Sequence, residues 1–202
     1  MYMLHLNGNL MCAVDVETTG LDPNVNEIVQ ICVLPLNAHC QPDTKVQPFD
    51  ILIKPENIDG IDKNLKGVFR ERIIKAINTG IPAYDAADLL NDWFEKLHLA
   101  ERKRVSPLGH NWPFDRSFLI KWLGPQNYEY IFDGRYRDTQ AVALFLNDRA
   151  WMNVEQYPYP KVTLRYISTQ LRIDSAKDKF HDAMYDCIIT AEIYRRMMQG
   201  AL

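Results

Sequence analysis

Cysteine is scarce in this 202-residue sequence, and no two cysteines stand in the CxxC spacing that zinc sites and redox motifs use. The four that occur are Cys12, Cys32, Cys40 and Cys187. Three of them lie in apolar segments, where a reduced thiol behaves as a small hydrophobic side chain. The cysteine pattern argues against a zinc site and predicts a reducing, cytoplasmic environment.

Long apolar runs and an excess of basic charge are also missing. No apolar stretch reaches the roughly 20 residues of a membrane span. The opening residues MYMLHLNGNL lack the basic start and long apolar core of a signal peptide. Lys and Arg number 23 against 26 Asp and Glu, for a formal net charge of −3. We expect no membrane partner, and any nucleic acid must be bound locally with the help of metal ions rather than by a basic surface.

The sequence does contain a mixed pattern of strands and helices, and 47% of its residues are hydrophobic, enough for a sizeable core. Apolar runs predict strands at Leu10–Val16, Ile28–Leu36, Phe49–Ile53 and Arg104–Leu108, and a last strand that ends near Asp138. Helices are predicted at Asp62–Asn78, Asp85–Leu97 and Pro113–Leu123, and three more complete the chain after Asp138, the last of them at Asp182–Met198. This order predicts a single α/β domain over residues 1–202, a mixed central β-sheet flanked by helices on both faces.

Two carboxylates end the first predicted strand. Asp15 and Glu17 come just before Thr18-Thr19-Gly20, which breaks the apolar run. Residues two apart on a strand point to the same face, so both carboxylates lie on one side. They repel each other unless a cation or a proton lies between them, and a hard, oxygen-ligated ion such as Mg²⁺ is suited to that place. Taken alone, such a pair is more often a solvated strand end.

A third acid opens a helix in the middle of the chain. Asp115 falls in the first turn of the helix that begins at Pro113. Taken alone, it is as often an ordinary helix-start residue as a ligand. The neighbouring His110 and Asn111 are expected to shape the turn from strand to helix rather than to bind metal, because a single histidine lacks partner ligands here.

The last patch lies at the start of the final helix. His181 precedes the helix, and Asp186 follows five residues later, about one and a half turns into it. An acid at this position can bind a metal while a histidine at the mouth of the helix reaches an attacking water. Taken alone, a capped helix with a surface histidine is the commoner explanation.

Together the patches supply what hydrolysis of a phosphodiester needs. The reaction requires an in-line water, a base to deprotonate it, and positive charge on both the entering and the leaving oxygen. Two divalent ions about 3.5–4 Å apart provide that charge. We predict that Asp15, Glu17, Asp115 and Asp186 bind the ions, and that His181 is the general base because it is neutral near its unperturbed pKa of about 6.5.

The three patches also match the motifs of a known superfamily. The patterns D-x-E-T/S-T-G-L, H-N-x-x-F-D-x-x-F-L and H-x-A-x-x-D-x-x-x-T/A occur here as VDVETTGL, HNWPFDRSFL and HDAMYDCIITA. In these motifs the sequence resembles the DnaQ-like 3′–5′ exonuclease superfamily, in its DEDDh branch, from about Leu10 to Tyr194. The segments Asp138–Leu146 and Thr163–Asp174 resemble the family's strand-end aspartate with its apolar helix and its leucine-rich helix. The polymerase III epsilon proofreading subunit and RNase T are the members most similar in pattern.

This resemblance implies a ribonuclease H-like fold and removal of nucleoside 5′-monophosphates, one at a time, from the 3′ end of single-stranded nucleic acid. DNA is slightly favoured over RNA, and the expected cofactors are two Mg²⁺ ions, for which Mn²⁺ can substitute. Asp138 is expected to be structural. The residues expected to contact the terminal nucleotide are Thr18, Thr19, Gly20, Leu21, Asn111 and Phe114. For Leu21 and Phe114, burial in the core is an equal alternative.

Several alternatives stay open at this point. The chain could be a catalytically silent nucleic-acid- or polymerase-binding module, although the intact acids and His181 argue against it. An internally cutting nuclease of the same fold and a phosphohydrolase that uses His181-Asp182 fit the motifs less well. The sequence leaves the choice of sugar open, as well as the choice between a lone enzyme, a homodimer and a polymerase partner. The segment 54–84 departs from the family pattern and is a candidate substrate element.

Overall fold

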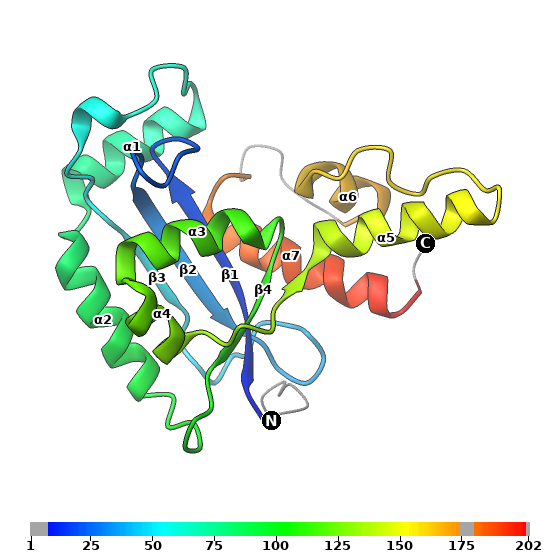
Figure 1. Ribbon diagram of the computed structural model, residues 1–202, viewed down its shortest axis with the longest axis horizontal. Helices are drawn as coiled ribbons and strands as arrows, with labels where there is room; N and C mark the ends of the chain where they lie inside the picture. Colours follow the sequence, from blue (N-terminus) through cyan, green and yellow to red (C-terminus); the bar gives the residue numbers. More distant parts are fainter. Residues whose placement is uncertain (1–7, 174–179, 201–202) are drawn as a thin grey trace.

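The computed structural model describes residues 8–173 and 180–200 (Figure 1). Within them, one mixed sheet has the strand order β3-β2-β1-β4-β5. The strands are β1 (Leu10–Thr18), β2 (Ile28–Pro35), β3 (Phe49–Leu52), β4 (Val105–Gly109) and β5 (Arg137–Asp138). The β1–β2 and β2–β3 pairs are antiparallel, whereas β1–β4 and β4–β5 are parallel. Strand β1 is therefore central, and its carboxyl end lies in the middle of one sheet edge.

Seven α-helices and a short 3₁₀ turn, Ile58–Gly60, accompany the sheet in the described residues. The helices are α1 (Val68–Thr79), α2 (Ala83–Glu95), α3 (Trp112–Leu123), α4 (Pro125–Ile131), α5 (Thr139–Met152), α6 (Leu164–Gln170) and α7 (Ala183–Met198). They cover both faces of the sheet, so the predicted α/β, ribonuclease H-like architecture is confirmed.

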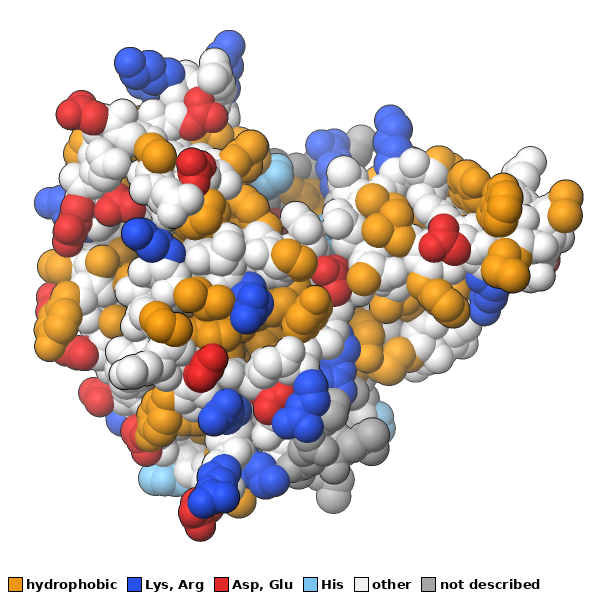
Figure 2. Space-filling model, in the orientation of Figure 1, with side chains coloured by type: hydrophobic (Ala, Val, Ile, Leu, Met, Phe, Trp, Pro, Cys, Tyr) orange, Lys and Arg blue, Asp and Glu red, His pale blue; other side chains and the backbone are white. Residues whose placement is uncertain are grey.

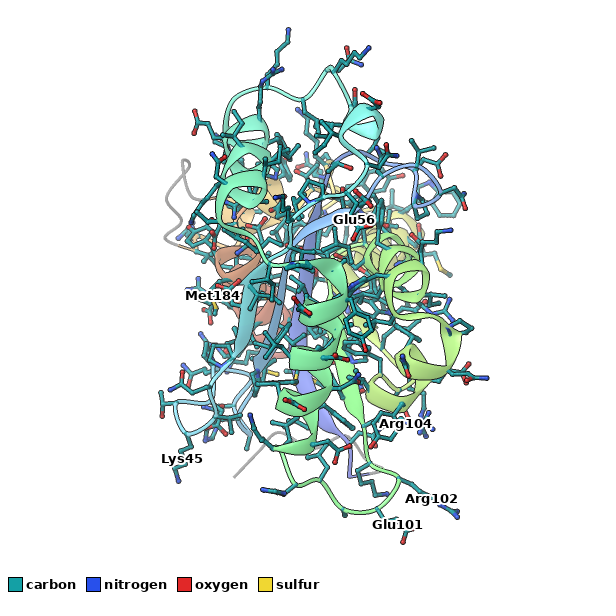
Figure 3. The ribbon with its side chains drawn as sticks, turned by 90° about the vertical axis from the view of Figure 1, so that its left-hand side faces the viewer. Lys45, Glu56, Glu101, Arg102, Arg104 and Met184 are labelled. Carbon is teal, nitrogen blue, oxygen red and sulfur yellow. The ribbon has the colours of Figure 1, made fainter. Side chains whose placement is uncertain are left out.

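Alternate side chains of β1 point to opposite faces of the sheet. Leu10, Cys12, Val14 and Val16 all belong to the core that contains buried residues of α2 and α3. The intervening Met11 and Ala13 pack instead with α7, in a cluster that includes Cys187. Figure 3 looks along the sheet and shows α7, marked by Met184, on the side of the strands opposite to α3. Side chains at odd positions of β1 therefore point toward α7.

A third cluster joins α5, α6 and α7 beyond the sheet, with Ile167, Ile189 and Ile193 among its buried members. These helices form the arm on the right of Figure 1. Exposed apolar side chains gather at the outer part of this arm (Figure 2); they include Phe145, Trp151 and Met152 of α5. Because α7 contributes to both this cluster and the sheet core, it connects the arm to the sheet.

Some predicted boundaries were wrong. The helix expected from Asp62 begins at Val68, because Gly67 has φ 58° and ψ −132°, which an α-helix cannot include. The N–H of Asp62 instead donates to the Thr19 carbonyl at 2.9 Å. Helix α4 was not predicted; it begins at Pro125, directly after Gly124 with φ 75°.

Two further predictions concern residues outside the described ranges. The helix predicted at Thr163–Asp174 ends at Gln170, and Asp174 itself lies outside them. Most of the opening segment MYMLHLNGNL also lies outside the described part. Among the described helices, none combines the length and the apolar character needed to cross a membrane.

Candidate active site

Strand β1 brings two carboxylates to the centre of the sheet edge. Asp15 and Glu17 continue the row of Met11 and Ala13, so they point toward the side on which α7 packs. Asp15 is half-buried, and Glu17 is only 8% exposed. The strand therefore holds both acids on one face, as the i, i+2 spacing predicts.

Helix α3 begins beside the end of β1 and adds a third acid. Strand β4 pairs with β1 only as far as Ala13, because the chain then turns into α3. Beyond that point the N–H of Val16 is free of the ladder on this side and donates to Asp115 Oδ1 at 3.0 Å. Asp115 is 3% exposed, and this hydrogen bond fixes its carboxylate beside β1 at Val16, the residue between Asp15 and Glu17 in the sequence.

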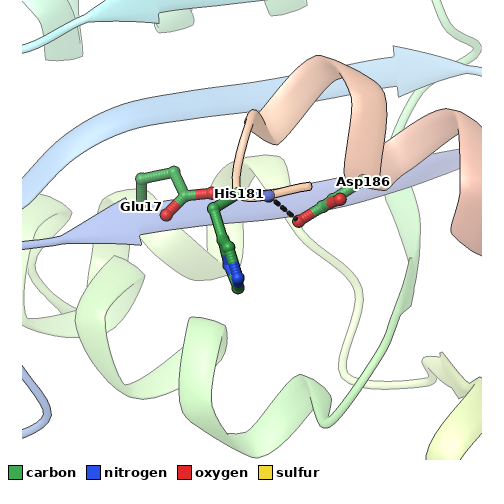
Figure 4. Close-up of side chains that lie close together, drawn as sticks. All are labelled: Glu17, His181 and Asp186. Atoms are coloured by element: carbon green, nitrogen blue, oxygen red, sulfur yellow. Dashed lines mark hydrogen bonds between the residues drawn. The ribbon is translucent and has the colours of Figure 1, made fainter. Parts of the chain in front are cut away.

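Helix α7 contributes the last acid and the histidine. Asp182 is the N-cap residue and accepts the N–H of Tyr185 at 3.1 Å. Asp186 lies in the first turn and is 6% exposed, and its Oδ2 accepts the N–H of His181 at 3.0 Å (Figure 4). The other oxygen of Asp186, Oδ1, is buried and has no hydrogen-bond partner among the described residues. That oxygen is available to a cation.

Three patches that are far apart in sequence thus line one pocket. Its lining includes Asp15, Glu17, Asp115, His181 and Asp186. Ligand atoms of Glu17, His181 and Asp186 all lie within 4.8 Å of one another, close enough to hold a single ion (Figure 4). Asp15 and Asp115 line the same pocket but are not part of this tightest group.

The electrostatics of the pocket disfavour four free carboxylates. Burial and the neighbouring acids raise the pKa of Asp15 well above its ordinary value. Burial also raises the pKa of Glu17 and of Asp115 to about 8, and that of Asp186 to about 7. For Glu17 the nearby Arg72 acts in the opposite direction. Carboxylate oxygens of this number and closeness fit hard divalent cations, whose charge would offset the repulsion.

His181 is suited to accept a proton. Although the residue as a whole is exposed, desolvation of the ring, followed by the positive charges of Arg72 and Arg165, lowers the pKa of His181 below its usual value. The imidazole is thus neutral near pH 7, as a general base must be.

The residues expected to contact substrate divide into two groups. Thr18, Gly20, Leu21 and Phe114 line the pocket, with Leu21 at its rim and 79% exposed. Leu21 is therefore not a core residue. Phe114 is half-buried, and its ring centroid lies 5.0 Å from that of Phe118.

Thr19 and Asn111 do not line the pocket. Thr19 is buried, and its side-chain oxygen accepts the N–H of Glu27 at 2.9 Å. Asn111 is exposed, with φ 64° in the left-handed region that asparagine tolerates. Its N–H donates to Asp138 Oδ1 at 3.0 Å. Both residues shape turns beside the site.

Position 20 requires a glycine because the side chain of Asn26 lies very close to it. A Cβ at this position would lie 2.5 Å from side-chain atoms of Asn26. Asn26 Nδ2 donates to the carbonyls of Gly60 at 2.7 Å and Thr19 at 3.4 Å, so it cannot readily move away. The glycine lets the loop after β1 close tightly against the pocket.

Asp138 organises the turns around the pocket. Its carboxylate accepts the N–H groups of Asn111 and Trp112, each at 3.0 Å, and that of Gln140 at 2.8 Å. It is 9% exposed and does not line the pocket. The residue joins the start of α3 to the start of α5, which agrees with the structural role that the resemblance implies.

Sequence reasoning missed four residues that line the pocket: Val16, Leu65, Phe69 and His110. Phe69 lies against His181, with ring centroids 4.1 Å apart. Leu65 and Phe69 come from the segment 54–84, whose departure from the family pattern was the available signal. His110 was expected only to shape the turn; its Nδ1 lies 2.8 Å from Thr139 Oγ1, and the ring also borders the pocket.

Comparisons with known proteins agree with this geometry. The family model RNase_T, described as "Exonuclease", matches residues 12–194. One curated relative is the DNA polymerase III PolC-type of Ureaplasma parvum serovar 3, which is 25% identical over 185 residues. The match covers 91% of this chain but 11% of the polymerase, so the chain spans about a tenth of that relative's length.

Solved structures share the fold. The nuclease domain of 3′hExo, a DEDDh family member bound to rAMP, matches with a TM-score of 0.66 and 18% identity, over 95% of this chain and 92% of that one. E. coli Exonuclease I in complex with an oligonucleotide matches with a TM-score of 0.61 and 15% identity, over 95% of this chain and 40% of that one. At these identities the likeness concerns the fold.

Proposed function

Because the chain belongs to the exonuclease family whose model spans residues 12–194, we propose that it hydrolyses phosphodiester bonds at the 3′ end of single-stranded nucleic acid. The observation that carries this proposal is the convergence of Glu17, His181 and Asp186, with Asp15 and Asp115, in one pocket. The expected products are nucleoside 5′-monophosphates released one at a time.

The four acids are the proposed ligands of two divalent metal ions, Mg²⁺ or Mn²⁺. When bound, the ions would supply positive charge at the reacting phosphate and at the attacking water. Asp115 and Asp186 are each held by a main-chain N–H, from Val16 and His181 respectively, so their carboxylates are oriented before any ion binds. Such orientation lowers the cost of assembling the site.

His181 is the proposed general base. A ring nitrogen of the neutral imidazole accepts a proton from the attacking water as the water oxygen bonds to phosphorus. The bond from phosphorus to the leaving 3′ oxygen breaks, and solvent supplies the proton for that oxygen. The lowered pKa of His181 keeps the ring unprotonated before the reaction. Asp15, Glu17, Asp115 and Asp186 would hold the cations as ionised carboxylates, and the cations would attract the scissile phosphate.

The rim residues are proposed to receive the terminal nucleotide. Leu21 is exposed next to the pocket and offers an apolar surface on which a base can pack. Phe114, on helix α3, lines the same pocket. Thr18 donates its hydroxyl to the Gly20 carbonyl at 2.6 Å, which fixes the main chain that borders the site.

DNA is the proposed first substrate, and the polymerase relative supports this choice because its name places it in DNA synthesis. The same relative supports a polymerase partner over a homodimer. We also propose that residues 1–202 form a single exonuclease domain, since every residue of the pocket comes from the sheet, the helices around it or the loops that join them.

The test uses 5′-labelled single-stranded DNA and RNA oligonucleotides of the same sequence, with Mg²⁺, with Mn²⁺ and with EDTA. We expect a ladder that shortens from the 3′ end, depends on metal and forms faster on DNA. A strand whose 3′ hydroxyl is blocked serves as the control and is expected to stay intact. Cleavage in the middle of the strand, or shortening in EDTA, would refute the proposed reaction.

A further inference from the structure

The turn that carries His181 needs support from its surroundings. His181 has φ 70°, in the left-handed region that non-glycine residues rarely occupy and that persists only where neighbours impose it. Its N–H is bonded to Asp186 Oδ2 at 3.0 Å, but the residue itself is exposed. A single main-chain hydrogen bond leaves the direction of the ring free, so further contacts must hold it.

Helix α1 supplies such contacts from side chains one turn apart. The Phe69 ring lies against His181, with the two planes at 39°. Arg72 Nη1 lies 3.0 Å from Asp182 Oδ2, in the residue that follows His181. The other carboxylate oxygen of Asp182 caps helix α7. One carboxylate thus joins α1 to the start of α7, directly beside the histidine.

The guanidinium of Arg72 is itself anchored to the sheet. Its Nη1 also donates to the side-chain oxygen of Gln30 on β2. Gln30 is buried, and its Nε2 donates to Asp50 Oδ1 on β3 at 2.8 Å. The Arg72 side chain is 13% exposed, so solvent screens the ion pair with Asp182 less than it would a surface pair. This network fixes the position of Asp182 relative to the sheet that carries Glu17.

We propose that Arg72 is a positioning residue, which acts through Asp182 to hold the turn that directs His181 into the pocket. This inference rests on the exonuclease function proposed above, because it assigns Arg72 a role in the reaction. Arg72 does not line the pocket, so apart from the effect of its charge on Glu17 and His181 it acts through the main chain at Asp182 and His181.

The first test compares Arg72→Met with Arg70→Met at saturating divalent metal. Each variant removes one positive charge from the same helix, but Arg70 is exposed. We expect Arg72→Met to lower kcat about tenfold to a hundredfold with little change in KM, because small misplacements of a reacting group cost that much. Arg70→Met should match the wild type. Equal kcat values for the two variants would overturn the proposal.

Arg72→Lys and Asp182→Asn test the ion pair itself. Lysine keeps a cation and should recover part of the lost kcat. Asparagine still caps a helix but lacks the carboxylate charge, so Asp182→Asn should lower kcat as Arg72→Met does. The double variant should lose no more than either single variant, since both remove the same contact. Additive losses, or a kcat loss explained by a lower melting temperature, would contradict the proposal.

A readout without metal or substrate separates this inference from the proposed function. We expect hydrogen–deuterium exchange in a peptide that spans Phe180 to Cys187 to be faster in Arg72→Met than in Arg70→Met. If the wild type is inactive on every strand, the proposed function fails while the exchange result still reports on the contact. Equal exchange in the two variants would overturn the positioning role even in an active enzyme.

Discussion

At the residue scale, the acids of the pocket differ in what holds them. Asp15 and Glu17 are placed by strand geometry alone, which the sequence predicts from their spacing. Asp115 and Asp186 are placed by hydrogen bonds to main-chain groups on other segments or turns, at Val16 and His181. Those bonds depend on how β4 ends and on the φ of His181, which no local pattern reveals.

The raised pKa values give a testable pH dependence. Carboxyl groups titrate near pH 4 in the unfolded chain. Burial raises the pKa of Glu17 to about 8 and that of Asp186 to about 7 in the folded protein. Between about pH 4 and about pH 8 the folded state therefore binds more protons than the unfolded state. The free energy of unfolding of the metal-free protein falls as pH rises through this range.

Divalent ions should reverse this loss, because they bind the ionised form. We expect Mg²⁺ or Mn²⁺ to raise the melting temperature more at pH 8 than at pH 5. Glu17→Gln removes one of the repelling charges, so the metal-free variant should melt with less dependence on pH. Melting temperatures with and without metal at both pH values check this, and equal metal effects at the two values would count against the carboxylate site.

At the element scale, the strands could be predicted from the sequence, whereas the helix boundaries that depend on turns could not. The apolar runs predicted the central strands, since a buried strand leaves a clear pattern. The predicted start of α1 was wrong because the segment before Gly67 folds back onto Thr19, a tertiary contact that the local sequence does not reveal. Helix α4 was missed because Gly124-Pro125 is typical of a loop. The error at the start of α1 also hid two pocket residues: Leu65 precedes the true start of the helix, and Phe69 lies in its first turn.

Asp138 gives a stability prediction at this scale. Asp138→Ala leaves the N–H groups of Asn111, Trp112 and Gln140 without their acceptor, so we expect a loss of about 3 kcal/mol in the free energy of unfolding. Thr163→Ala is the matched control, since Thr163 caps α6 through one N–H and should cost only about 1 kcal/mol. Urea unfolding compares them, and equal losses would show that Asp138 does not join the two turns.

At the scale of the whole molecule, the charge is balanced. The net charge is −3, and acidic and basic side chains are interspersed over the face in Figure 2. Among the described residues that line the pocket, none is Lys or Arg. Substrate is therefore expected to bind through the cations and a small number of phosphate contacts.

Salt dependence tests this expectation. With two or three phosphate contacts to a single strand, we expect KM for an oligonucleotide to rise about tenfold between 50 and 200 mM salt. A protein that makes six or more such contacts loses about 300-fold or more in affinity over the same range. KM values at the two salt concentrations, with divalent metal held constant, distinguish these cases. A steep dependence would indicate an extended basic track that the pocket lacks.

The central claim is that carboxylates on β1, α3 and α7 form one hydrolytic centre with His181. Asp15→Asn tests it most directly, beside Asp88→Asn, which removes the same charge from an exposed position on α2. The measurement is the rate at which a 5′-labelled strand shortens with Mg²⁺. We predict a loss of about a thousandfold or more in Asp15→Asn, a wild-type rate in Asp88→Asn, and wild-type folding in both. Retained turnover in folded Asp15→Asn would contradict the account.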